Sequence, residues 1–78
     1  MALDDNLRRG LASALRALEE RKSLAIRMQE QAERNRQPLL AQTWSDRARE
    51  FEGELNIIRD SVERLEDIAR DAAKRAAE

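Results

Sequence analysis

The clearest pattern in the chain runs from residue 41 to residue 76. Alternate steps of three and four residues along this stretch meet only apolar side chains, while most residues between them are Arg, Glu, Asp or Gln. Such a heptad repeat with apolar a and d positions is typical of a helix that packs along another helix. It predicts one long helix over residues 38–77. The apolar positions are Ala41, Trp44, Ala48, Phe51, Leu55, Ile58, Val62, Leu65, Ala69, Ala72 and Ala76.

The first part of the chain carries a similar but wider apolar stripe. Apolar residues recur at helical spacing from Leu7 to Ala32, and Asp4 and Asp5 precede them. Aspartate side chains cap helix N-termini because their oxygens accept hydrogen bonds from free backbone N–H groups. We therefore predict a helix over residues 4–35. Its stripe is widened by Leu15 on one side and by Gly10, Ala17 and Leu24 on the other.

A single break separates the two patterns. Asn35 tolerates the left-handed backbone that ends helices, and Pro38 suits the first turn of the next helix. A turn at residues 36–37 is so short that the two helices must form an antiparallel hairpin.

The two stripes match when they are counted outward from the turn. Leu18 comes level with Leu55, while Arg21 and Lys22 fall beside Phe51 and close to Glu52 and Glu54. These carboxylates can take the charges of the two basic side chains. The match along the whole length predicts the fold. We expect an all-α protein, an antiparallel two-helix hairpin of coiled-coil type, forming a single domain over residues 1–78.

A seam between only two helices does not bury all the large aliphatic residues, and it leaves Ile26, Ile57 and Ile68 exposed. A chain of 78 residues has little stability to spare. We therefore expect a second copy to cover them, so that a homodimer or larger assembly forms a four-helix bundle. The residues predicted to form the core and the interface are Leu11, Leu15, Leu18, Leu24, Trp44, Phe51, Leu55, Ile58, Val62 and Leu65.

Trp44 supports two interpretations. As a d-position residue it would seal the loop end of the hairpin against Met28. As a large aromatic residue beside an exposed loop it could instead anchor a partner, since Trp is over-represented among binding hot spots. The heptad position favours the core.

The charges are numerous but balanced. Fifteen basic and sixteen acidic residues are interspersed, so no basic face favours a nucleic-acid partner. Acidic residues often precede basic ones by four positions, as Glu66 precedes Arg70, and we expect ion pairs along each helix there. No stretch approaches the run of about 20 apolar residues that a membrane span needs. Without a signal-peptide core or any cysteine, a cytoplasmic setting is expected.

The sequence predicts neither catalytic, cofactor-binding nor metal-binding residues. The chain contains no His and no Cys, which removes the usual nucleophile–base pairs and the common zinc ligands. The adjacent acids Glu19 and Glu20 point about 100° apart on a helix and do not share a proton. We therefore expect a protein that is not an enzyme and that needs no cofactor.

Two segments of the first helix resemble a known family. Residues 14–21 read Ala-Leu-Arg-Ala-Leu-Glu-Glu-Arg, and residues 24–28 read Leu-Ala-Ile-Arg-Met. They look like the helical C-terminal tail of chemotaxis-type protein-glutamate methylesterases, and the resemblance extends over about residues 11–62. In that family an α/β domain with a Ser-His-Asp triad precedes the tail and removes methyl esters from receptor glutamates. No such domain is present here, so no catalytic residue carries over.

The resemblance implies a non-catalytic appendage of a signalling protein, with that protein as a further partner. Trp44 stands where Phe is expected, and the Ala-rich segment after Leu65 is longer than in the family. An alternative is a small secreted helical hairpin with a Trp-x-Gly turn, although Asp46 occupies the glycine position. A generic coiled-coil assembly protein is a third interpretation.

Overall fold

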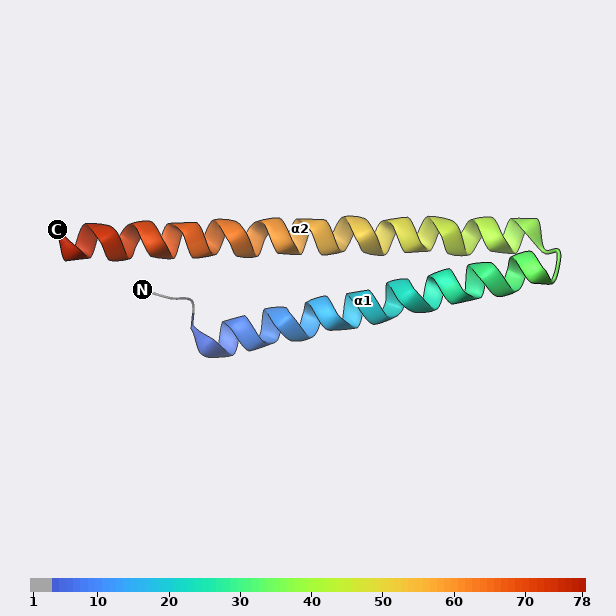
Figure 1. Ribbon diagram of the computed structural model, residues 1–78, viewed down its shortest axis with the longest axis horizontal. Coiled ribbons are helices and arrows are strands. Elements are labelled where there is room, and N and C mark those ends of the chain that lie inside the picture. Colours follow the sequence, from blue (N-terminus) through green and yellow to red (C-terminus); the bar gives the residue numbers. More distant parts are fainter. Residues whose placement is uncertain (1–3) are drawn as a thin grey trace.

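The computed structural model describes residues 4–78, so the first three residues of the predicted 1–78 domain lie outside it. Two α-helices make up this described part, without a strand: α1 spans Asp5–Arg34 and α2 spans Pro38–Ala77. They pack side by side and are joined at one end by a short loop (Figure 1). The molecule is a rod that measures 64 × 17 × 11 Å. The prediction of an all-α two-helix hairpin is confirmed.

Each helix begins at a residue suited to that position. The carboxylate of Asp4 accepts hydrogen bonds from the backbone N–H groups of Asn6 at 2.7 Å and Leu7 at 3.3 Å. Two of the N–H groups that the start of a helix leaves without partners are thereby satisfied. Pro38 opens α2, where its missing N–H costs no helical hydrogen bond.

The loop ends α1 with a left-handed residue. Arg36 has a φ of 55°, and the N–H of Gln37 donates to the carbonyl of Ala32 at 2.9 Å. This geometry satisfies a carbonyl at the end of the helix and turns the chain toward α2. The sequence suggested Asn35 for the left-handed position. Because α1 ends at Arg34, Asn35 is the cap with a φ of −85°, and the left-handed residue is the next one.

The buried core is a single line of residues on each helix. The buried positions recur every seven residues, which is two helical turns. Four of the six are alanine, and small side chains at the contact let two helices come close together. The buried residues are Leu18, Ala25 and Ala32 on α1 and Ala41, Ala48 and Leu55 on α2.

The helices pack closely only toward the loop. Figure 1 shows α1 and α2 close together near the loop and further apart toward the start of α1. Among the described residues, 4–78, every buried one lies between Leu18 and Leu55, on the loop side of the hairpin. Leu11 and Val62 are the next positions along the same line and are half-buried. The seam therefore continues past Leu18 and Leu55, but less tightly.

The last third of α2 departs from the predicted seam. Leu65 was expected inside and is exposed, whereas Glu66 is half-buried. A straight helix with 3.6 residues per turn drifts by about 20° per heptad relative to a strict seven-residue repeat. The line that faces α1 therefore shifts by one position, and the predicted seam is wrong here. Ala72 and Ala76 are exposed for another reason, because α2 extends past the start of α1 there (Figure 1).

Candidate functional site

Two lines of residues flank the buried line on each helix, one on either side. On one side, seven of the eight positions are polar; on the other, seven of the eight are apolar. We call them the polar flank and the apolar flank. The polar flank consists of Arg8, Leu15, Lys22 and Gln29 on α1 and Ser45, Glu52, Arg59 and Glu66 on α2. The apolar flank consists of Leu7, Ala14, Arg21 and Met28 on α1 and Trp44, Phe51, Ile58 and Leu65 on α2.

Ion pairs connect the two helices along the polar flank. The Lys22 Nζ lies 2.6 Å from a carboxylate oxygen of Glu52, and an Arg8 guanidinium nitrogen lies 4.0 Å from one of Glu66. These pairs are fourteen residues apart on both helices, which fixes a constant antiparallel register. In that register Leu18 is level with Leu55, as the sequence predicted.

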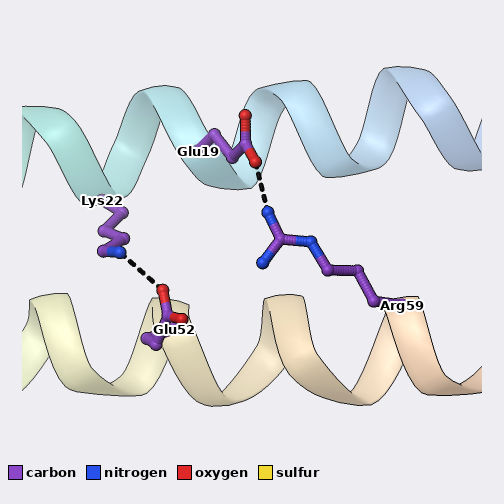
Figure 2. A network of polar contacts seen from close by, with 4 residues as sticks. All are labelled: Glu19, Lys22, Glu52 and Arg59. Carbon is purple, nitrogen blue, oxygen red and sulfur yellow. Dashed lines mark hydrogen bonds and ion pairs between the residues drawn. The ribbon is translucent and has the colours of Figure 1, made fainter.

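A third ion pair joins Arg59 to Glu19, close to the Lys22–Glu52 pair (Figure 2). The side chains of both pairs retain between about a third and a little more than half of their exposure. Pairs in contact with water contribute about 0–1 kcal/mol each. They therefore stabilise the hairpin little, but they align the helices and cover one side of the core.

Glu52 is the carboxylate most affected by this arrangement. The hydrogen bond from Lys22 and the charge of the same ammonium group lower the pKa of Glu52 below its ordinary value, and Arg59 adds a smaller effect. The prediction that Lys22 finds its partner near Phe51 is confirmed for Glu52.

A shallow groove of about 280 Å³ lies along the polar flank, lined by both ion pairs together with Ser23, Ile26 and Leu55. Its acidic and basic side chains neutralise one another across the helices. The groove therefore presents no excess of either charge that would select a charged ligand. It also places Ile26 on the same side of the hairpin as the ion pairs.

The apolar flank is more open than the polar flank. On α2, Phe51 and Ile58 are half-buried and Leu65 is 41% exposed; on α1, Leu7 is 47% exposed. Further out on the same side of α1 lies Leu24, which is 49% exposed. This side of the hairpin is therefore an apolar surface that α1 and α2 leave partly uncovered.

Trp44 lies at the loop end of the apolar flank and is half-buried. The guanidinium carbon of Arg47 lies 5.5 Å from the centre of its ring, a cation–π distance. The indole Nε1–H is buried and makes no hydrogen bond within residues 4–78. The structure thus gives Trp44 a packing role in the hairpin, and a role as an anchor for a partner stays a hypothesis.

The ten residues predicted for the core and interface fall into three groups. Two are buried, six are half-buried and two are exposed. The exposed ones belong to the open apolar surface rather than to the hairpin core. In the same order, the groups are Leu18 and Leu55; Leu11, Leu15, Trp44, Phe51, Ile58 and Val62; and Leu24 and Leu65.

The predicted core set omitted four of the six buried residues within residues 4–78, and three of the four ion pairs there were not predicted. The four buried alanines were part of the stripes but not of the set, although their seven-residue spacing marks them as one line. Glu66 was expected to pair with Arg70 four residues later. Instead Glu66 pairs with Arg8 across the hairpin, while Arg70 pairs with Asp67.

No group of three or more Asp, Glu, His or Cys side chains within residues 4–78 is placed to hold a metal ion. Neither helix, over its described residues, combines the length and the apolar composition that crossing a membrane requires. Comparisons with protein-family models, with curated proteins and with solved structures each find no match for this chain.

Proposed function

We propose that this chain is a non-catalytic helical module that associates with itself, forming a homodimeric four-helix bundle. The observation that carries the proposal is the amount of large aliphatic surface left in water. Within residues 4–78 only two large side chains are buried, whereas eight are exposed by 37% or more. The exposed ones are Leu7, Leu24, Ile26, Leu39, Leu40, Ile57, Leu65 and Ile68.

The surface area of the hairpin supports the same proposal. A compact monomer of 9.0 kDa exposes about 4,900 Å² by the usual scaling of area with mass. The hairpin exposes 6284 Å². The excess is about 1,400 Å² per chain relative to that scaling. A stable homodimer buries about 1,000–2,500 Å² on each partner, so the excess is of the size that one interface would cover.

Self-association would be energetically favourable because the core of a single hairpin is small. Each fully buried Leu or Ile side chain contributes about 1.5–3 kcal/mol relative to an exposed one. Domains of this size have only a few kcal/mol of net stability. A second copy packed on one side of the hairpin would bury the large side chains on that side without any further protein.

Sedimentation equilibrium at micromolar concentration tests the proposal. We expect a mass of about 18 kDa, twice that of the 9.0 kDa chain. A chain that is helical by circular dichroism and sediments as a 9.0 kDa monomer would overturn it.

The narrower part of the proposal is that the module serves a methylesterase-like signalling protein in the cytoplasm. Its support is the resemblance of residues 11–62 to the helical tail of that family. Mixing the fluorescently labelled chain with a purified methylesterase of this family should raise its fluorescence anisotropy. An unchanged anisotropy at micromolar enzyme would remove this narrower role and leave self-association intact.

A further inference from the structure

The two sides of α2 differ in what they offer to a second molecule. At 100° per residue, Glu52 lies about 60° to one side of the buried Leu55. Phe51 and Ile58 lie about 40° and 60° to the other side. The residues of α2 that border the buried line are therefore polar on one side and apolar on the other, and the charged Arg47 lies over the Trp44 ring on the apolar side.

The same separation holds on α1. Lys22 lies about 40° from the buried Leu18 on one side, whereas Ala14 and Leu24 lie about 40° and 120° away on the other. Because Lys22 pairs with Glu52 across the helices, these two residues define one face of the hairpin (Figure 2). Ala14 and Leu24 then share the opposite face with the apolar residues of α2.

The face with the ion pairs is unsuited to a tight apolar interface. A second molecule packed there would remove Lys22, Glu52, Arg59 and Glu19 from water. The desolvation of charged groups costs several kcal/mol per ion and is not always repaid by their pairing. Those groups already satisfy one another within a single chain.

The opposite face is suited to close approach. Gly10, Ala17 and Leu24 follow one another at seven-residue intervals along the outer edge of the apolar flank of α1. A Cβ atom added at Gly10 would meet nothing within 4 Å, so there is open space beside it. Small residues on α1 therefore lie on the same face as the bulkier Ile58 and Leu65 of α2, and the open space at Gly10 leaves room for side chains from another helix.

We infer that the second copy packs on the apolar flank, face to face around a two-fold axis, with the ion pairs on the outside of the bundle. This inference rests on the proposed self-association and specifies its surface. The excess area of about 1,400 Å² per chain relative to a compact monomer matches one such interface. The apolar flanks of two hairpins supply the second layer of core that one hairpin lacks. Arg21 is the one charged residue within the flank, and its methylene groups can line the interface while its guanidinium reaches the rim.

Two substitutions on the same helix test the surface. Leu24→Glu places a charge on the apolar face, and Ile26→Glu places the same charge on the face of the ion pairs. The wild-type side chains are of similar size and similarly exposed, at 49% and 37%. We expect Leu24→Glu to raise the Kd of the dimer by at least about 100-fold, since an interface does not accept an unpaired charge. Ile26→Glu should change the Kd by less than about 3-fold.

A labelling experiment gives a second readout that does not depend on a disruptive substitution. The chain contains no cysteine, so a single introduced thiol reports on its own position. The thiol of Ala17→Cys should react with a maleimide more slowly at concentrations where the chain is dimeric than where it is monomeric. The thiol of Ser23→Cys, beside the groove of the polar flank, should react at the same rate in both.

The outcomes separate this inference from the proposed function. A wild-type chain that stays monomeric overturns both. A wild-type dimer that Ile26→Glu dissociates, or that neither or both glutamate variants dissociate, keeps self-association but overturns the assignment of its surface. Equal protection of the thiols at positions 17 and 23 would overturn the assignment as well.

Discussion

The half of the hairpin near the loop and the open half share one heptad spacing but differ in packing. We call residues 18–55 the loop half and the remaining described residues the open half. All six buried residues belong to the loop half, and in the open half the corresponding line is at best half-buried. An apolar pattern therefore places residues on one side of a helix without determining how closely two helices approach.

The difference follows from side-chain size. Ala25 and Ala48 lie level with each other in the loop half, where the helices are close. The next positions outward along the line beyond Leu18 and Leu55 hold the larger Leu11 and Val62. The distance between packed helices depends on the side chains at the contact, so alanine allows closer packing than Leu opposite Val.

The largest expected effect comes from emptying the core of the loop half. Leu55→Ala should lower the free energy of unfolding by about 2–5 kcal/mol, because it leaves a cavity opposite Leu18. The matched change in the open half, Ile57→Ala, removes a side chain that is 67% exposed and should cost at most about 0.5 kcal/mol. Urea denaturation at one protein concentration measures both. Equal losses would mean that the two halves are packed alike.

Enlarging an alanine sharpens the comparison. Ala48→Leu should cost about 1–3 kcal/mol, since the added carbons force the closely packed helices apart. Ala73→Leu, at a half-buried position of the open half, should change stability by less than about 0.5 kcal/mol. Thermal unfolding followed by circular dichroism separates the two. A stabilised Ala48→Leu variant would contradict close packing in the loop half.

The cap at the start of α1 tests how well the open half is held together. Asp4→Ala removes the acceptor of two backbone N–H groups and should cost about 1 kcal/mol. Amide hydrogen exchange should accelerate at Asn6 and Leu7, while Ala25 in the loop half keeps its rate. An equal acceleration at Ala25 would show that the hairpin opens as one unit.

The smallest effect concerns pH. Because Lys22 lowers the pKa of Glu52 in the folded state, the ionised carboxylate favours folding. This contribution is complete above the unfolded pKa of about 4.3 and is lost as the pH falls through the lower folded pKa. Wild type and Glu52→Gln should therefore differ in stability at pH 7, and the difference should shrink progressively as the pH falls below about 4. Glu66→Gln removes a carboxylate that lies 4.0 Å from Arg8 in the open half. Its stability at pH 7 should differ from that of wild type by less than the stability of Glu52→Gln does. A difference that persists for Glu52→Gln at low pH would contradict the role of its charge.

The sequence predicted the features that depend on local chemistry. Both helices lie within one residue of the predicted ranges, because Asp4, Asn35 and Pro38 act through bonds to their own neighbours. The antiparallel register, with Leu18 opposite Leu55, was also predictable, since the short loop fixes it.

The side of α1 that turns toward α2 was not predictable in the same way. Arg21 and Lys22 interrupt the stripe together, yet Lys22 is half-buried and paired while Arg21 is exposed. A rotation of α1 by a few tens of degrees decides between them, and heptad spacing does not fix it. For the same reason the pairing of Arg59 with Glu19 followed only from the structure.

The short loop also determines the order in which the hairpin assembles. Ala32 and Ala41 are nine residues apart in the sequence, whereas Leu18 and Leu55 are thirty-seven apart. Closing the larger loop directly costs about 1.2 kcal/mol more in chain entropy, since each doubling of length adds about 0.6 kcal/mol. We therefore expect contacts beside the left-handed Arg36 to form first, with each later pair closing only a short additional segment. On this expectation folding starts at the turn and proceeds along the rod, and the end that forms last should fray first when the protein unfolds.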